Sequence, residues 1–340
     1  MPKSNNLPAG LAAASTHCVV CDLTPLALLS ISGADAGTFL QGQLSNDVTA
    51  LTERTWQYTS YNSPAGRMLA NFPLWRSGDD PTGFRALLPG DIAPPVRERL
   101  ARYVLRSKVT LVDESAASAR FGIGGPTAAA AIAAVFGSVP EPRALVRSTA
   151  TEILALSTTR FVVIAPKDTA APLAASLQAH ATPADDAVWR WLAIRAGVGI
   201  VTQATQDRFV PQMANLDALD GLSYQKGCYT GQEIVARTHY LGRLKERLFA
   251  YHAPASEALP EPGARVWSSA FGDQPCGTVV SAAPSPLGGF DLLAVLQIAA
   301  AASGDVRLQP IGGAALEPFS LPYAIPEPAE PRGRNTPGRP

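Results

Sequence analysis

The chain has 340 residues, of which 46% are hydrophobic and 16% charged, enough for two or three globular domains with a sizeable core. Its 28 Lys and Arg balance 28 Asp and Glu, so no net charge attracts nucleic acid or an anionic membrane, and we expect no direct partner of either kind. The longest apolar runs are far shorter than the roughly 20 residues of a membrane-spanning helix. Without a signal-like N-terminus, the sequence predicts a cytoplasmic protein.

Four cysteines are too few to cross-link a chain of this length, so disulfides are not expected to form its framework. Cys18 and Cys21 form a single C-x-x-C, but the intervening Val19 and Val20 favour a strand over a redox turn. The four histidines are scattered along the sequence. We therefore expect no metal site.

The predicted elements begin after a Ser-, Asn- and Pro-rich lead over residues 1–16, which we expect to be disordered. Gly33-Ala34-Asp35 leads into an amphipathic pattern with Phe39, Leu40 and Leu44 on one face, which predicts a helix that closes near residues 46–47. Two aromatic-rich alternating runs flank a turn that contains Gly66, which predicts a hairpin. In chain order the predictions for this part are a strand at 26–31, the helix, hairpin strands at 54–61 and 68–75, a strand at 84–88 and a helix at 91–105.

A second block of mixed pattern follows and predicts another α+β unit, with helices on one face of an antiparallel sheet. Its glycine run at 122–125 does not match the dinucleotide-binding pattern, because no G-x-G-x-x-G and no following acidic residue are present. The predictions here are strands at 109–112, 121–123, 153–156 and 161–164, and helices at 126–136 and 170–180.

The last part of the chain returns to the first block and then becomes β-rich. A helix is predicted over 187–195, and we expect residues 187–242 to rejoin the first domain, which we divide from the second near residue 112. Short strands separated by Pro and Gly predict a β-barrel over 243–324. Residues 325–340 are rich in Pro, Arg and Glu, which predicts a disordered tail.

The segment from Lys226 to Glu233 combines a lone thiol, a turn and a helix start. Thr230 and Glu233 have the spacing of a capping box, which predicts a helix from about residue 231. Cys228 would then lie just before a helix N-terminus, where the helix dipole favours a thiolate. A functional thiol and a small buried cysteine are both compatible with this pattern.

A longer stretch resembles the signature of the YgfZ family, whose members are related to the T-protein (aminomethyltransferase) of the glycine cleavage system. It runs from Phe209-Val210-Pro211-Gln212-Met213-Ala214-Asn215 through Lys226-Gly227-Cys228-Tyr229-Thr230-Gly231-Gln232-Glu233 to Arg237. Residues 39–48 and the hairpin at 62–75 also resemble elements that both families share. The resemblance implies an α+β, T-protein-like multidomain fold, with two mixed α/β domains around a central cavity and a C-terminal β-barrel.

It also implies function. Members of the YgfZ family bind folate and support the assembly or repair of iron-sulfur clusters, and through it tRNA thiolation. The expected cofactor is tetrahydrofolate, and the expected partners are iron-sulfur assembly proteins or client iron-sulfur enzymes. Cys228 would be the functional thiol. The residues of this chain that we expect to contact folate are Asn46, Asp47, Trp56 or Tyr58, Asn71, Arg195, Gln212 and Asn215.

Three further expectations concern Asn71, Arg195 and the basic residues around the signature. The T-protein hairpin has a pair of aspartates where this chain has Ala70-Asn71, so aminomethyl transfer should be crippled while the pocket survives. Arg195 would bind a folate carboxylate if it faces the pocket, and would be a solvated charge otherwise. Lys226, Arg237 and Arg243 would form a positive rim, or merely a solvated face.

Two alternatives remain open from the sequence. One is a folate-dependent one-carbon transferase that uses another residue as its base. The other is a thiol redox protein that uses Cys228 alone. No resolving cysteine lies near Cys228 in sequence, although Cys276 could approach it in space.

Overall fold

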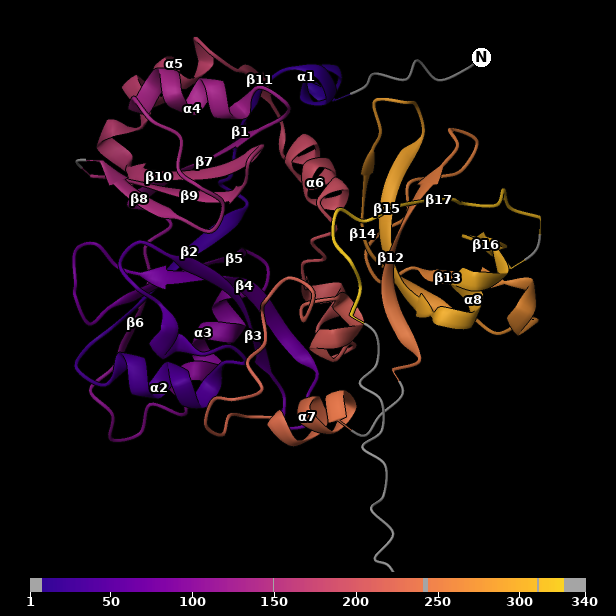
Figure 1. Cartoon of the computed structure of the whole chain (residues 1–340), viewed down its shortest axis with the longest axis horizontal. Helices are drawn as coiled ribbons and strands as arrows, with labels where there is room; N and C mark the ends of the chain where they lie inside the picture. The colour runs from indigo at the N-terminus through magenta and orange to yellow at the C-terminus, as the bar shows by residue number, and fades with distance from the viewer. Residues whose placement is uncertain (1–7, 149, 241–243, 311, 327–340) are drawn as a thin grey trace, which may run out of the picture.

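Three sheets organise the computed structural model, which describes residues 8–148, 150–240, 244–310 and 312–326 (Figure 1). The first sheet has the order β3-β4-β5-β2-β6 and carries the predicted hairpin. Its strands are β2 (Leu26–Ser32), β3 (Trp56–Asn62), β4 (Met68–Arg76), β5 (Phe84–Pro89) and β6 (Thr110–Asp113). The helices of this part are α2 (Ala36–Gln43), the short η1 (Val48–Ala50) and α3 (Ala93–Ala101). Apolar side chains from this sheet and from α2 and α3 share one core.

The second sheet has the order β11-β1-β7-β10-β9-β8, and α4 and α5 lie over it in Figure 1. Its strands are β1 (Val19–Asp22), β7 (Ser118–Gly124), β8 (Leu145–Ser148), β9 (Thr151–Ser157), β10 (Arg160–Pro166) and β11 (Thr182–Ala184). The helices are α4 (Ala128–Phe136), η2 (Lys167–Thr169) and α5 (Ala170–Gln178). Strand β1 precedes the strands of the first sheet in the sequence, and the other strands of the second sheet follow them. The second sheet is therefore built from segments on both sides of the first. Cys18 and Cys21 are buried on and beside β1, as the strand interpretation predicts.

The third sheet curls into a half-barrel with the order β16-β13-β14-β15-β12-β17 (Figure 1). Its strands are β12 (Glu246–Ala253), β13 (Arg265–Ser268), β14 (Gly277–Pro284), β15 (Phe290–Gln297), β16 (Val306–Arg307) and β17 (Glu317–Phe319), with η5 (Ser269–Phe271) and α8 (Ile298–Ser303) beside them. The predicted β-rich C-terminal region is therefore present. Within the described residues it is an open curl, because no pairing joins β16 to β17.

Helix α6 (Asp186–Arg195) lies between the second and third sheets and packs on both (Figure 1). The glycines of β7 make this packing possible. A Cβ on Gly122 would be 2.5 Å from the Trp189 ring, and one on Gly124 would be 2.4 Å from Leu192. The glycine run therefore serves helix packing, which agrees with rejecting a dinucleotide site.

Two predicted boundaries were wrong. Residues 1–16 are not all a disordered lead, because α1 (Leu11–Thr16) is helical and buries Leu11 completely in the main core. Helix α3 ends at Ala101 instead of near 105, and Leu105 has a φ of +46°, which no α-helix accommodates. Most of the predicted tail, residues 327–340, lies outside the described residues.

Candidate functional site

The signature segment lies against the β3–β4 hairpin turn and the third sheet. It includes η4 (Pro211–Ala214) and most of α7 (Gln232–Tyr240), and η3 (Gln203–Thr205) precedes it. The Met68 amide at the start of β4 donates to the Phe209 carbonyl, and the Ser63 hydroxyl in the turn donates to Asp207 at 2.6 Å. These contacts hold the signature segment beside the turn.

Arg247 fixes the same segment to β12. This buried arginine forms a bidentate ion pair with Asp217, at 2.6 and 2.9 Å, and also donates to the Gln212 carbonyl at 2.7 Å. Asn215 has a φ of +56°, a conformation that Asn tolerates better than most residues, and its amide donates to the Leu248 carbonyl. Asn215 is thus part of the scaffold, and its expected contact with folate stays a prediction.

Helix α7 starts one residue later than the capping box predicts. Its first helical residue is Gln232, so Gly231, with a φ of +80°, occupies the N-cap position in place of Thr230. A Cβ on Gly231 would lie 2.5 Å from the Ser63 carbonyl oxygen and 2.8 Å from the Gly66 Cα. The helix start therefore rests directly on the hairpin turn, and only glycine permits this approach.

Cys228 precedes this contact by three residues and is exposed, whereas the other three cysteines are buried. Its neighbour Tyr229 is buried, and the Lys226 ammonium lies 5.0 Å from the centre of the Tyr229 ring. Cys276 is buried in the core of the third sheet, where burial raises its thiol pKa to about 11. Cys276 is therefore poorly suited to act as a redox partner for Cys228.

Lys226 is not on a positive rim, which corrects the prediction from the sequence. Its side chain is buried, and its ammonium donates to the carbonyls of Gln41, Leu44 and Asn46 at 2.7, 2.5 and 3.0 Å. These carbonyls end α2 and begin the following loop, so the lysine caps that helix. Burial lowers the pKa of Lys226 to about 8, and nearby Asp47 opposes this shift. Of the other proposed rim residues, Arg237 is exposed on α7, and Arg243 lies outside the described residues.

The remaining polar residues expected to bind pterin are bonded to the protein itself. Asn46 donates to the Tyr58 and Asp220 carbonyls, and Asp47 accepts bonds from Thr49 and Gln41. The bonds from Thr49 are the main reason that the pKa of Asp47 is lowered.

Asn71 of β4 is buried and links the first sheet to the loop at residues 199–201. Its Nδ2 donates to the Gly199 carbonyl and its Oδ1 accepts from the Val201 amide, both at 2.8 Å. With both amide atoms occupied, Asn71 anchors the 199–201 segment. Asn46 and Asn71 therefore stabilise the fold through both amide atoms, and the expectation that they and Asp47 contact a pterin stays a prediction.

Trp56 and Arg195 are also placed elsewhere. Trp56 is buried, and its indole donates to the Ala155 carbonyl of the second sheet at 3.0 Å, so it packs between the two sheets. The Arg195 guanidinium lies 4.1 Å from the centre of the Phe319 ring and 3.7 Å from Asp291, against the third sheet. Trp56 is buried and Arg195 is exposed, and a contact of either side chain with folate stays a prediction.

Two side chains that do retain free polar atoms lie beside the hairpin turn. Asn62, at the end of β3, is completely buried, and neither its Nδ2 nor its Oδ1 has a hydrogen-bond partner among the described residues. Gln212 donates from its Nε2 to the Val235 carbonyl and the Tyr224 hydroxyl, but its Oε1 has no partner among those residues. A buried orphaned amide is costly unless a ligand or water binds it. From the sequence, Asn62 is expected only to border the hairpin turn. That its side chain is buried and unpaired becomes visible only in the structure.

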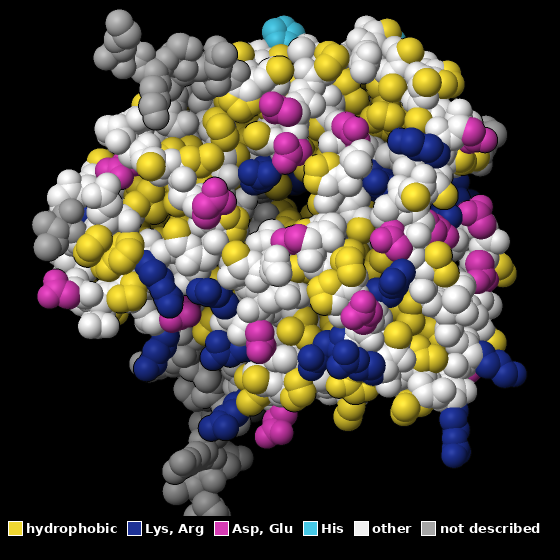
Figure 2. All heavy atoms as spheres, turned by 180° about the vertical axis from the view of Figure 1, so that it is seen from behind, with side chains coloured by type: hydrophobic (Ala, Val, Ile, Leu, Met, Phe, Trp, Pro, Cys, Tyr) yellow, Lys and Arg dark blue, Asp and Glu magenta, His cyan; other side chains and the backbone are white. Residues whose placement is uncertain are grey.

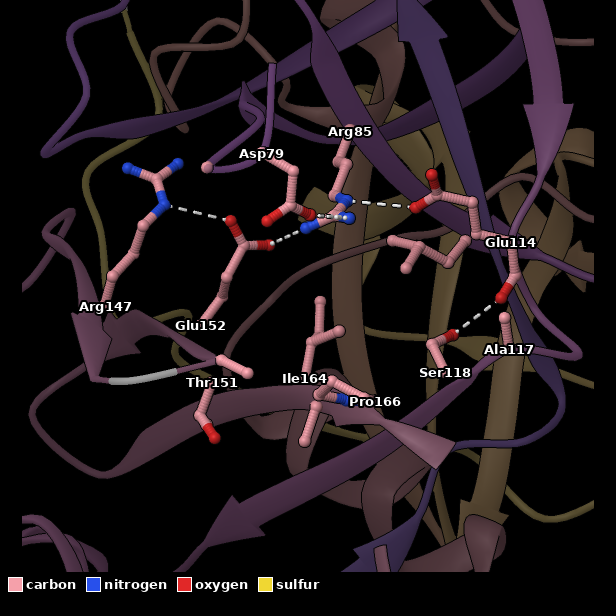
Figure 3. Close-up of a pocket in the computed structure, with 14 residues that line it drawn as sticks. Asp79, Arg85, Glu114, Ala117, Ser118, Arg147, Thr151, Glu152, Ile164 and Pro166 are labelled. Carbon is pink, nitrogen blue, oxygen red and sulfur yellow. Dashed lines mark hydrogen bonds and ion pairs between the residues drawn. The ribbon is translucent and has the colours of Figure 1, made fainter. Parts of the chain in front are cut away.

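A pocket of about 310 Å³ lies between the first and second sheets, but the predicted folate residues do not line it. Glu152 of β9 accepts bonds from Trp75 and Arg85 of the first sheet, and Arg147 of β8 binds its other oxygen (Figure 3). Arg85 also binds Asp79 and Glu114. These charged groups pair with one another, so the pocket is lined by an ion-pair network between the first and second sheets. Its charged groups are therefore not free to bind a ligand.

In the described part of the chain, no group of three or more His, Cys, Asp and Glu side chains is arranged to hold a metal ion. No helix among the described residues is long and apolar enough to cross a membrane.

The fold is of the glycine cleavage T-protein type. The family model for the GCVT N-terminal domain matches residues 5–165. The crystal structure of glycine cleavage system aminomethyltransferase T from Bartonella henselae covers 84% of this chain and 80% of its own, with a TM-score of 0.63 and 17% identity. The chain belongs to the YgfZ family: it is 35% identical, over 240 residues, to the tRNA-modifying protein YgfZ of both Shigella dysenteriae serotype 1 (strain Sd197) and Escherichia coli (strain SE11). Each alignment covers 70% of this chain and 72% of the relative.

Proposed function

We propose that this chain is a cytoplasmic, tetrahydrofolate-binding accessory protein for the assembly or repair of iron-sulfur clusters, and that Cys228 is its functional thiol. Through client iron-sulfur enzymes it would support tRNA modification indirectly, in keeping with the name of its relatives, tRNA-modifying protein YgfZ. The observation that carries the proposal is the exposed thiol of Cys228 in a loop that rests on the hairpin turn.

The unpaired polar atoms beside that turn suit the edge of a folate ring, and Gln212 is also among the residues expected from the sequence. A pterin presents several hydrogen-bond donors and acceptors along one edge. The orphaned amide of Asn62 offers one donor group and one acceptor, and Gln212 Oε1 adds another acceptor. These two residues would hold and orient the cofactor, which would supply one-carbon chemistry when bound.

Asn71 supports an accessory role over one-carbon transfer. It stands where the resemblance places an aspartate in the T-protein, and both its amide atoms are bonded to the backbone of Gly199 and Val201. It therefore cannot act as a general base, since an amide does not accept a proton near neutral pH.

The thiol is tested by complementation in a bacterial strain that lacks its own YgfZ protein. We expect wild type and Cys276→Ala to restore the activity of iron-sulfur enzymes and the level of tRNA thiolation, and Cys228→Ala to fail at normal abundance. Full rescue by Cys228→Ala would remove the thiol from the mechanism. Formation of methylene-tetrahydrofolate from an aminomethylated or methylated donor would instead identify a transferase.

A further inference from the structure

A second pocket, of about 390 Å³, lies between the hairpin turn, the signature segment and the third sheet. Each of these three parts contributes one arginine: Arg67 from the turn, Arg208 from the segment before η4 and Arg265 from β13. Glu246 of β12 is the one acidic residue in its lining, which gives the lining a formal charge of +2. On the face shown in Figure 2, by contrast, Lys and Arg lie interspersed with Asp and Glu, and the chain as a whole has no net charge.

None of these three arginines has a carboxylate partner among the described residues. The ion pairs of the described chain involve other arginines and His252, and Glu246 accepts instead from Gln297 at 2.7 Å. Arg67 is held in place because one of its nitrogens donates to the Arg208 carbonyl at 3.1 Å. Arg265 makes a long contact of 3.5 Å to the Thr278 hydroxyl. Most of the guanidinium donors are therefore free.

Three like charges around one pocket repel one another, and a bound anion would relieve this repulsion. The geometry favours an anion with oxygens pointing in several directions. A planar carboxylate is satisfied by a single arginine fork, whereas a tetrahedral phosphate can accept bonds from arginines on three separate segments. A compact pocket also suits a small molecule better than a long nucleic-acid strand, which would need an extended basic groove.

We propose that this pocket is an anion-binding site that takes the phosphate group of a small molecule. The site adjoins the signature segment through Arg208 and Phe209. Its occupant would therefore bridge the hairpin turn and the third sheet. This proposal rests on the charges that line the pocket and does not depend on a functional role for the Cys228 thiol.

Pyrophosphate is the probe that tests it, titrated into the full-length protein by calorimetry at low ionic strength. We expect wild type to bind, and Arg208→Gln/Arg265→Gln to bind at least about tenfold more weakly, because charge-assisted hydrogen bonds to two guanidinium groups are lost. Arg102→Gln/Arg106→Gln is the matched control. It removes two exposed arginines that have no ion-pair partner among the described residues and lie outside the pocket, so its affinity should stay within about twofold of wild type.

Circular dichroism and thermal melts of both variants check that each is folded. Absence of pyrophosphate binding by wild type at millimolar concentration would overturn the proposal, and so would an equal loss of affinity in the control variant. A single-stranded RNA oligomer that binds wild type, loses affinity in Arg208→Gln/Arg265→Gln and is not displaced by pyrophosphate would assign the pocket to RNA and also overturn the proposal.

Discussion

At the scale of single residues, burial decides what each polar side chain of the signature does. Lys226 and Asn215 look like ligand-binding groups in the sequence, yet their hydrogen bonds go to main-chain carbonyls. Asn71, in the neighbouring hairpin, is used in the same way. Cys228 differs, because it is exposed. The signature thus consists largely of residues that build the loop on which one exposed thiol is presented.

Asn62→Leu should separate stability from ligand binding. The substitution removes a buried amide with no partner among the described residues, so we expect the free energy of unfolding of the ligand-free protein to rise by about 1–2 kcal/mol. Tetrahydrofolate affinity should fall about tenfold, because the proposed anchor is lost. Urea unfolding and a fluorescence titration measure the two effects.

Asn71→Leu is the matched control for that variant, since it changes a buried asparagine of the same hairpin whose amide atoms are both bonded. It leaves the Gly199 carbonyl and the Val201 amide unpaired, so we expect a loss of about 2 kcal/mol in unfolding free energy. If Asn62→Leu is destabilising to the same extent, Asn62 is a structural residue and not a ligand anchor.

The lowered pKa of Lys226 predicts how the free energy of unfolding depends on pH. Its folded-state pKa of about 8 is lower than its unfolded value of roughly 10.4. Between these values the unfolded chain binds more protons than the folded chain, so the contribution of Lys226 to the free energy of unfolding rises with pH in this window. Below pH 8 the lysine is protonated in both states, and its contribution is constant.

Urea unfolding of wild type and Lys226→Met between pH 7 and 10 measures this effect. The difference in unfolding free energy, wild type minus variant, should increase above pH 8 by on the order of 1 kcal/mol, a value reduced for solvent screening. A difference that decreases as pH rises would contradict the lowered pKa.

At the scale of elements, glycines set how closely helices and turns approach. The start of α7 meets the β3–β4 turn at Gly231, where a Cβ would come within 2.5 Å of the Ser63 carbonyl oxygen. Gly122 and Gly124 play a comparable part in β7, where they leave room for Trp189 and Leu192 of α6. These close contacts join segments that are far apart in sequence.

Gly231→Ala should therefore destabilise the protein by about 2 kcal/mol or more. The positive φ of Gly231 alone costs an alanine roughly 1–2 kcal/mol, and the clash with the turn adds to it. Gly227→Ala, four residues earlier, is the control, because a Cβ there meets no atom within 4 Å. Chemical denaturation measures both, and equal stability of the two variants would show that α7 does not depend on this contact.

At the scale of the whole molecule, a buried carboxylate joins the first two sheets. Glu152 is 4% exposed and receives hydrogen bonds from Trp75 and Arg85 of the first sheet and from Arg147 of the second (Figure 3). Trp56 adds a hydrogen bond across the same boundary, to the Ala155 carbonyl. The two sheets are therefore coupled by polar contacts as well as by a shared apolar core.

Glu152→Gln should cost about 3 kcal/mol, because two partly buried guanidinium groups lose their shared counter-charge. The surface variant Glu98→Gln, which breaks no ion pair of the described residues, should change stability by less than about 0.5 kcal/mol. Thermal unfolding followed by calorimetry compares them. A wild-type-like transition for Glu152→Gln would show that the network does not hold the sheets together.

Most elements of this fold could be predicted from the sequence, because hydrophobic periodicity and turn residues act over short distances. The hairpin is an example: strands expected at 54–61 and 68–75 are found at Trp56–Asn62 and Met68–Arg76. The sequence does not predict the short helix α1, because the polar residues around it in the sequence mask the apolar pattern of Leu11. Strand β1 was found, but its pairing with β7 and β11 was not foreseeable, since the partners are about 100 residues or more away in sequence.

The sequence by itself determined the family, the mixed α/β character and the segment that carries Cys228, because a signature motif and local patterning are properties of neighbouring residues. The tertiary structure alone decided which polar groups are free. The Lys226 ammonium finds its acceptors more than 175 residues away, and Asn71 bonds to a loop 128 to 130 residues distant. Such long-range bonds consume the groups that looked like ligands, and they leave Asn62, Gln212 and the exposed thiol as the candidate site.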